Sequence, residues 1–333
     1  MLAVPAMPDV DERTAALIEL GRALRETGYS FVTVTPETHR RVDARAAAAG
    51  HANGSSLRDV FGWSRPFEAG VLPAHIMELA RAANILALDG REGGADAEGA
   101  RYRSRVRFSS LGEHLFVHSA YPTAAADAVF FGPDTYRYCE LVAAEARLAP
   151  RRARRAVDIG CGSGAGGIVA ASDADRVVLA DINAGALRLS AANAVLAGVA
   201  DRVEVTESDV LRSVNGPIDL VIANPPYMVD PASRAYRDGG GSFGEALAVR
   251  IAREALARLE PGGRLVLYTG AAVVNGVDTF LRAVREVCIE ARAAFCYREL
   301  DPDVFGEEIE QNDAYATVER IAAVALVATV RDA

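Results

Sequence analysis

The stretch Ala156-Val157-Asp158-Ile159-Gly160-Cys161-Gly162-Ser163-Gly164 joins a short apolar run to a glycine-rich loop, and an alanine-rich segment follows it. That order predicts a strand, a tight loop and a helix. Glycines at this spacing let the chain turn sharply and let a ligand approach the backbone near the start of a helix. The loop alone is a weak signal, because dinucleotide-binding enzymes and ordinary tight turns share it. Its meaning depends on the segments around it.

Apolar strand-like runs alternate with helix-like segments on both sides of this loop. The runs lie at 156–159, 177–180, 203–205, 220–223 and 265–268, and the helical segments lie near 135–147, 184–197 and 245–258. Such alternation is typical of a parallel sheet with helices on both faces. We therefore predict an α/β fold, with a Rossmann-like, doubly wound and mostly parallel sheet, over residues 123–333.

The first part of the chain has helical patterns instead. Residues 10–27 carry Leu17, Leu20 and Leu24 at helical spacing before Gly28, and a second helix with an apolar side is expected from Pro73 as far as residue 86. A loop rich in glycine and acidic residues follows at 90–99. These features predict a smaller, mainly helical N-terminal domain over residues 1–98, which we expect to recognise the substrate.

A period of two begins after that loop. A strand is expected over residues 101–108, where every second residue is an arginine: Arg101, Arg103, Arg105 and Arg107. Gly112 is expected to form a turn, and residues 115–117 are expected to form the second strand of a hairpin. We predict a β-hairpin linker over residues 99–122 with one wholly cationic face. Guanidinium groups on that face suit phosphates or an acidic protein surface, so the four arginines are candidate substrate contacts. The alternative is a solvated face neutralised by nearby acids.

Acidic residues follow the next two strands. Asp181 stands with Ile182 at the end of the second run, and Asp209 stands with Val210 after the third. A carboxylate at the first place can accept both hydroxyl hydrogens of a ribose. A carboxylate at the second place could hold the amino group of an adenine. The spacing also fits a nicotinamide cofactor, so an NAD-dependent oxidoreductase is open at this point.

The fourth strand runs into Asn224-Pro225-Pro226-Tyr227. The two prolines end the strand and fix the direction of Asn224. The Asn224 amide oxygen and the carbonyl before the second proline can each accept a hydrogen from a planar amino group, which aligns the nitrogen lone pair with an electrophile. Tyr227 can stack on a flat amide or base. An oxidoreductase would need a proton-relay residue here, and the sequence has prolines instead.

Composition removes several classes of enzyme. All 36 basic side chains are arginine, against 45 acids and a net charge of −9. Without lysine, a phosphate-binding loop ending in Gly-Lys-Ser/Thr, a Schiff-base lysine and a lysine general base are excluded. The negative charge disfavours a nonspecific nucleic-acid coat protein. No apolar run suits a membrane span, no signal peptide is expected, and the four cysteines are widely separated, so we predict a cytoplasmic bacterial protein without disulfides or an obligate metal.

Together, the glycine loop, the acids at the strand ends and the Asn-Pro-Pro-Tyr motif resemble class I S-adenosylmethionine-dependent N-methyltransferases, over about residues 123–270. The resemblance implies S-adenosyl-L-methionine as the cofactor, with the loop glycines around its methionine part, Asp158 near its amino group, Asp181 on its ribose and Asp209 on its adenine. The residues it implies for the cofactor are Asp158, Gly160, Cys161, Gly162, Gly164, Asp181, Ile182, Asp209, Val210, Asn224, Phe131 and Thr135. Catalysis is expected from Asn224, Pro225, Pro226 and Tyr227, and further substrate contacts from Tyr236 and Gly240.

A helical domain, a hairpin and then the catalytic domain, with Pro133-Asp134-Thr135 opening a helix, resemble the HemK-type protein glutamine methyltransferases of this family. Gly132 stands where those enzymes usually have arginine, and the tail around 299–308 differs from theirs. The acceptor therefore stays open among a protein glutamine, which we expect first, an exocyclic base amine of rRNA, tRNA or DNA, and a small-molecule amine. A module that binds S-adenosylmethionine without turnover is a further alternative. We expect a protein or nucleic-acid partner that carries a planar amino group, and no membrane.

Overall fold

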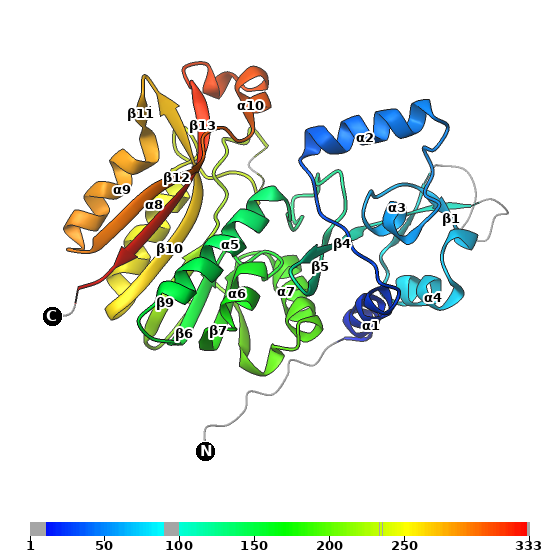
Figure 1. The fold of residues 1–333 in the computed structure, drawn as a ribbon, viewed down its shortest axis with the longest axis horizontal. Helices are drawn as coiled ribbons and strands as arrows, with labels where there is room; N and C mark the ends of the chain where they lie inside the picture. Colours follow the sequence, from blue (N-terminus) through cyan, green and yellow to red (C-terminus); the bar gives the residue numbers. More distant parts are fainter. Residues whose placement is uncertain (1–10, 90–99, 233, 235, 332–333) are drawn as a thin grey trace.

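The chain builds a twisted central sheet with a smaller N-terminal region beside it (Figure 1). The computed structural model describes residues 11–89, 100–232, 234 and 236–331. Strand order in the sheet is β12-β13-β10-β9-β6-β7-β8, with β11 paired to β10. The strands are β6 (Ala153–Ile159), β7 (Ala174–Asp181), β8 (Val203–Glu207), β9 (Ile218–Ala223), β10 (Leu259–Val274), β11 (Val277–Asp278), β12 (Ala294–Asp301) and β13 (Arg320–Thr329).

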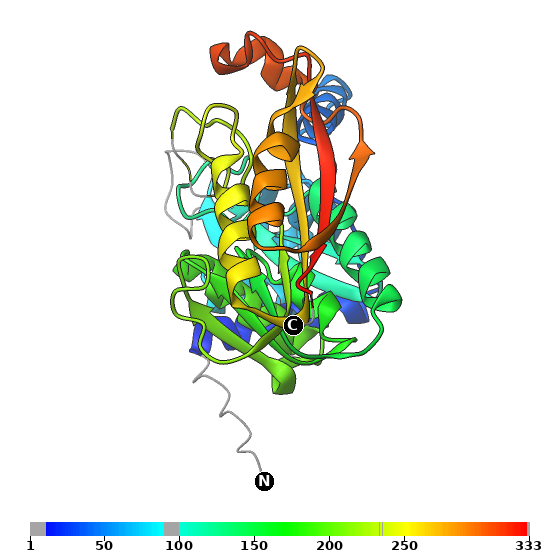
Figure 2. The ribbon, with the colours of Figure 1, turned by 90° about the vertical axis from the view of Figure 1, so that its left-hand side faces the viewer.

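Strands β10, β9, β6, β7 and β8 pair in parallel, whereas β13 pairs antiparallel with β10 and β12. The inner strands are apolar on both faces because helices cover both, as Val157, Val178 and Val221 illustrate with exposed fractions of 0–1%. Figure 2 shows α8 and α9 on one side of the sheet and α5 on the other. The helices are α5 (Pro133–Leu148), α6 (Ala165–Ala170), α7 (Ala184–Leu196), α8 (Ala246–Arg258) and α9 (Thr279–Glu290). The predicted Rossmann-like sheet is confirmed.

Within residues 11–89 and 100–104, the N-terminal region forms four helices and a small sheet. The helices are α1 (Glu12–Glu26), α2 (Pro36–Ala48), α3 (Leu57–Phe61) and α4 (Ala74–Ala82), and the sheet has the order β1-β3-β2 from β1 (Phe67–Glu68), β2 (Leu86–Leu88) and β3 (Arg101–Ser104). The expected helix from Pro73 is confirmed, but its extension to Leu86 is wrong. Asn84 adopts a left-handed φ of 54°, which ends the helix and lets Leu86 begin β2. The loop expected at 90–99 lies outside the described residues.

The predicted hairpin is present as β4 (Val106–Leu111) and β5 (His114–Ser119), with Gly112 at the turn. The expectation of one wholly cationic face is wrong. The Ser104 hydroxyl donates to the Val106 carbonyl over 2.6 Å and accepts from the Val106 amide, and the strand breaks at Arg105. Arg107 then turns inward, where it is 4% exposed and its guanidinium lies 5.1 Å from the centre of the Phe31 ring. Burial lowers the pKa of Arg107 to about 10.

Buried Asn193 joins the hairpin to the catalytic sheet. Its side chain accepts from the Val117 amide over 2.8 Å and donates to the Val117 carbonyl and the Ser163 carbonyl, each over 2.9 Å. Helix α7, which carries Asn193, also packs on α1 in one apolar cluster with Leu20 and Leu196. The position of the glycine loop is therefore fixed from the N-terminal side of the molecule.

The C-terminal segment, residues 301–319, lies at the carboxyl ends of the parallel strands. After β12 the chain forms α10 (Gly306–Gln311) and a 3-10 turn η3 (Asp313–Tyr315) before β13 crosses the sheet. Two other 3-10 turns are η1 (Ala69–Val71) and η2 (Ala200–Arg202). None of the helices in the described part of the chain is long and apolar enough to cross a membrane.

Candidate active site

A cleft opens at the carboxyl ends of the parallel strands. It holds about 1440 Å³ of open space, including solvent at its mouth. The glycine loop, the ends of β7 and β8 and the Asn-Pro-Pro-Tyr corner after β9 all line it. Clefts at this edge of doubly wound sheets are where ligands bind, because loops converge there and backbone groups are free. The structure therefore brings together motifs that lie far apart in the sequence.

The glycine loop curls tightly between β6 and α6. Gly160, Gly162 and Gly164 have φ values of 66°, 53° and 78°, which side chains other than glycine adopt only with strain. The Gly160 and Cys161 amides donate to the Ala180 carbonyl over 2.8 and 3.1 Å, which holds the loop against β7. A Cβ at Gly160 would meet nothing within 4 Å. Open space therefore lies directly in front of this part of the loop.

Asp158 lies behind the loop and is not part of the cleft wall. It is 1% exposed, and its two oxygens accept from the Tyr138 hydroxyl and the Gly167 amide, each over 2.7 Å. Burial raises the pKa of Asp158 to about 7, although both hydrogen bonds favour the ionised form. The carboxylate therefore holds helices α5 and α6 to the loop, and its place near a cofactor amino group stays a prediction.

Asp181 and Ile182 lie in the cleft at the end of β7. The Asp181 carboxylate accepts from the Gly162 amide over 2.9 Å and from the Asn183 amide over 2.9 Å. Burial raises the pKa of Asp181, and these amide donors oppose the shift. Beside it, the Ile182 side chain is 58% exposed although it is apolar. An acid next to an exposed apolar surface suits the sugar and the flat base of a nucleoside.

Asp209 and Val210 line the cleft after β8. Arg250 of α8 donates to both Asp209 oxygens over 2.8 and 2.9 Å, and this pairing lowers the pKa of Asp209. An adenine amino group would therefore share a carboxylate that already pairs with Arg250. Val210 has a φ of 54° and is 5% exposed, so the turn after β8 is tightly packed. Arg250 has no recognisable signal in the sequence.

The corner after β9 presents Asn224 to the cleft. Asn224 is half-buried and Pro225 is buried, and both line the cleft. Across residues 11–89, 100–232 and 236–331, the Asn224 side chain has no hydrogen-bond partner, so its amide is available to a ligand. Gly239 packs its backbone directly on Pro226 and Tyr227, where a Cβ would come within 2.8 Å. The backbone at Gly239 therefore packs tightly against the Asn-Pro-Pro-Tyr corner.

Tyr227 is held by a buried carboxylate that the sequence did not mark for this role. Tyr227 is 6% exposed and its hydroxyl donates to Asp134, which also accepts from the Tyr268 hydroxyl over 2.7 Å. Burial and the nearby Asp134 raise the pKa of Tyr227 well above 10. Arg137 lies 3.3 Å from the same carboxylate. Tyr227 is thus fixed through its hydroxyl, and it lines the cleft.

The remaining predicted residues divide between the cleft and other places. Thr135 and Tyr236 line the cleft. Phe131 does not, because its ring packs inward against His118 with the ring centres 4.9 Å apart; its neighbour Phe130 faces the cleft instead. The other predicted substrate contacts, Gly240, Arg101, Arg103, Arg105 and Arg107, also lie outside the cleft wall. Arg101 and Arg103 pair with Asp89 at 3.5 and 2.7 Å.

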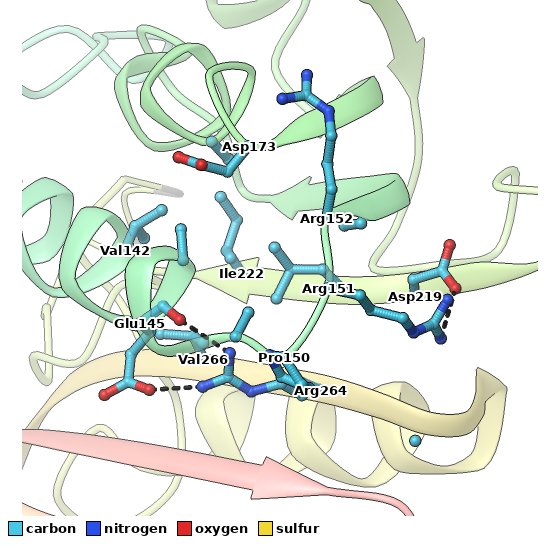
Figure 3. Close-up of a pocket in the computed structure, with 16 residues that line it drawn as sticks. Val142, Glu145, Pro150, Arg151, Arg152, Asp173, Asp219, Ile222, Arg264 and Val266 are labelled. Atoms are coloured by element: carbon cyan, nitrogen blue, oxygen red, sulfur yellow. Dashed lines mark hydrogen bonds and ion pairs between the residues drawn. The ribbon is translucent and has the colours of Figure 1, made fainter.

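A smaller cavity of about 600 Å³ lies at the opposite end of the strands, and Figure 3 shows its wall. Arg264 pairs with Glu145 at 2.5 Å, and Arg151 pairs with Asp219 at 3.2 Å. These charges already have partners in the protein, and none of the residues that the sequence predicts for a site lines this cavity. The cleft is therefore the candidate active site.

Comparisons with known proteins agree with this geometry. The family model of the methyltransferase small domain matches residues 142–292. The release factor glutamine methyltransferase of Deinococcus radiodurans is 30% identical over 259 residues, which cover 72% of this chain and 88% of that protein. That of Cereibacter sphaeroides is 37% identical over 141 residues, covering 38% and 50%. The tRNA1(Val) (adenine(37)-N6)-methyltransferase of Aeromonas hydrophila is 31% identical over 153 residues, covering 42% and 64%.

The match to the Deinococcus radiodurans enzyme extends over most of both proteins, whereas the chain spans about half the length of the Cereibacter sphaeroides one. The central sheet, the glycine loop and the match to the family model all fall in the same part of the chain. The chain belongs to the HemK family of class I N-methyltransferases, which includes these release factor glutamine methyltransferases.

Proposed function

We propose that this N-methyltransferase moves a methyl group from S-adenosylmethionine to the side-chain nitrogen of a glutamine in a protein, and that the protein is a peptide release factor. The observation that carries the proposal is that the glycine loop and the Asn224 corner line one and the same cleft. One side of the cleft suits a nucleoside cofactor, and the other suits a planar amide. The name of the Deinococcus radiodurans relative supports the choice of acceptor.

The residues present fit S-adenosylmethionine. Gly160 has open space in front of it, and the exposed apolar side chain of Ile182 lies beside the Asp181 carboxylate. Asp181 would hold the ribose hydroxyls, Ile182 would contact the adenine, and Asp209 would accept from the adenine amino group. When bound, S-adenosylmethionine supplies an electrophilic methyl group on a positively charged sulfur.

Asn224 then orients the acceptor. Its amide oxygen and the Pro225 carbonyl each accept one hydrogen of the acceptor nitrogen, so that the nitrogen lone pair points along the line of attack. Both oxygens also stabilise the positive charge that grows on the nitrogen as the new bond forms. Tyr227, fixed by Asp134, packs beside the amide and excludes water.

A protein acceptor fits the charge of the molecule better than RNA. The net charge is −9, and a domain that binds nucleic acid usually carries an excess of exposed positive charge. Arg101 and Arg103, which were candidates for phosphate contact, already pair with Asp89. We further propose that residues 1–98 recognise the acceptor protein, that 99–122 link them to the catalytic residues 123–333, and that Pro36 at the start of α2 borders the acceptor entrance.

The test uses the full chain, tritium-labelled S-adenosylmethionine and a purified, unmethylated bacterial release factor. We expect label in the release factor, and we expect Asn224→Ala to lower kcat by about a hundredfold or more because the nitrogen loses its orientation. Asn215→Ala is the matched control, since Asn215 is exposed and lies outside the cleft wall. Label that appears only in added ribosomal RNA or tRNA, and disappears with ribonuclease, would favour a base amine. Calorimetry that shows tighter binding of NAD than of S-adenosylmethionine would contradict the proposal.

A further inference from the structure

The C-terminal segment folds back over the acceptor side of the cleft. The Val304 amide donates to the Ile321 carbonyl of β13 over 2.7 Å, and Val304 is 7% exposed. The next residue, Phe305, lines the cleft together with Asn224 and Tyr227. The centre of its ring lies 6.1 Å from that of Tyr227, at an interplanar angle of 59°. An aromatic side chain far from the catalytic motif in the sequence therefore completes its wall.

Phe305 reaches this place through an unusual backbone. Its φ and ψ are 56° and 38°, in the left-handed region, directly before α10. Side chains other than glycine, asparagine and aspartate rarely adopt that conformation, because Cβ crowds the following carbonyl. Residues in such conformations persist where the surrounding structure fixes them, and they cluster at active sites. Phe305 follows this rule, because it lies in the wall of the candidate active site.

Two sets of contacts tie the segment to the residues that follow the catalytic corner. The Asn312 amide group donates to the Val229 carbonyl over 2.9 Å, and the Val229 amide donates to the Tyr315 hydroxyl over 2.8 Å. Arg237, which also lines the cleft, pairs with Glu308 at 2.5 Å. The chain just after the corner and the chain around α10 are therefore held as one unit.

A third tie passes through the carboxylate that holds Tyr227. Arg137 of α5 lies 3.3 Å from Asp134 and 2.7 Å from Asp301, which begins the C-terminal segment. Asp134 accepts from the Tyr227 hydroxyl. The same cluster of charges thus positions Tyr227 and the strand end that leads to Phe305.

From these contacts we propose that Phe305 is a specificity-determining residue of the acceptor subsite. Its ring, held beside Tyr227 by the C-terminal segment, packs on the planar amide of the acceptor and narrows the subsite to a small flat group. The inference rests on the proposed function, because it concerns the acceptor of that same reaction. It also gives a role to the tail around 299–308.

The left-handed backbone allows a clean test. Phe305→Gly removes the ring and relieves the backbone strain, which offsets part of the stability lost with the ring's contacts to the core. Phe305→Tyr keeps the ring face. Phe295→Ala is the matched control, because Phe295 is half-buried on β12 and lies outside the cleft wall. Each full-length variant is assayed for kcat and KM with labelled S-adenosylmethionine and unmethylated release factor, and for S-adenosylmethionine binding by calorimetry.

We expect Phe305→Gly to lower kcat/KM for the release factor by about tenfold or more, mainly through KM, while the affinity for S-adenosylmethionine is unchanged. Phe305→Tyr should restore kcat/KM. When release factor and ribosomal RNA compete in one reaction, Phe305→Gly should lower the ratio of label in protein to label in RNA, because the wider subsite admits larger flat groups. The control should match the unaltered chain in all these measurements.

Three results would overturn the inference, and they differ. If the unaltered chain labels the release factor but Phe305→Gly keeps the same kcat/KM and the same protein-to-RNA ratio, only the role of Phe305 is refuted. If the unaltered chain places no label in the release factor, the proposed function fails and the role of Phe305 in it fails as well. An equal loss of S-adenosylmethionine affinity in Phe305→Gly would also refute an acceptor role.

Discussion

Tyr227 and Tyr268 donate to the same buried carboxylate, which provides a matched pair of substitutions. Asp134 is 4% exposed, and the two phenols use its two oxygens. Tyr227→Phe leaves the Oδ2 atom of Asp134 without its donor, whereas Tyr268→Phe leaves the Oδ1 atom with only the longer contact to Arg137, at 3.3 Å. A hydrogen bond to a charged group contributes about 1.5–3 kcal/mol, so Tyr227→Phe and Tyr268→Phe should each lower the free energy of unfolding by about that amount. The two variants should therefore be similar in stability.

Their effects on catalysis should differ, because Tyr227 lines the cleft and Tyr268 does not. A ring that loses its anchor beside Asn224 misplaces the acceptor, so Tyr227→Phe should lower kcat/KM by about ten- to a hundredfold. Tyr268→Phe leaves the Tyr227–Asp134 bond in place and should stay within about threefold of the unaltered chain. Denaturant unfolding and initial rates with labelled S-adenosylmethionine measure both quantities. Equal rates in the two variants, or no loss of stability in either, would refute this reasoning.

Three further predictions concern the loop, the cofactor side and the response to pH. Gly164→Ala should lower the free energy of unfolding in thermal melts by at least about 1 kcal/mol more than Gly28→Ala does. Both glycines have φ near 77°, but only a Cβ at position 164 would meet neighbouring atoms, within 3.0 Å. Arg250→Gln should weaken calorimetric S-adenosylmethionine binding about fivefold or more, because Asp209 loses the bidentate partner that fixes its orientation; unchanged affinity would contradict this role of the Asp209–Arg250 pair. Burial holds the pKa of His118 well below 6.5, so the unfolded chain binds a proton that the folded chain refuses. Stability should fall as pH drops below about 6.5, by up to about 1.4 kcal/mol per pH unit, and a His118→Gln chain that keeps the same slope would contradict this.

The catalytic sheet was predictable because its signals are local and consistent. Parallel strands buried on both faces give continuous apolar runs, and β6, β7 and β9 each lead into a glycine, an acid or an Asn-Pro-Pro turn that only a strand end explains. These patterns place Gly162, Asp181 and Asn224 at one edge of the sheet before any coordinates are known. The cleft confirms that the three lie together.

Contacts that depend on distant parts of the chain were not predictable. Asp134 and Tyr268 meet only after the sheet has formed, and Phe305 reaches the cleft only because β12 ends beside it and the Val304 amide pairs with the Ile321 carbonyl of β13. Arg107 shows a different limit. The strand breaks at Arg105, where the Ser104 side chain makes two hydrogen bonds to Val106, and hydrophobic periodicity alone does not predict such a break.

Helix α2 escaped prediction because it has almost no apolar side. Among its residues only His39 is buried. The start signal is nevertheless present in the sequence, since Thr35 caps the helix and Pro36 occupies its first turn. The capping residues therefore predict this helix, whereas hydrophobic periodicity does not.

The central claim is that the Asn224 corner directs a methyl group onto a planar amide nitrogen. Mass spectrometry of the release factor after incubation with S-adenosylmethionine and the full chain tests it most directly. The account predicts one added methyl group, located by fragmentation on the side-chain nitrogen of a single glutamine, and much slower methylation when Asn224→Ala replaces the unaltered chain. A methyl group on an oxygen or carbon atom, or equal methylation by Asn224→Ala, would contradict the account.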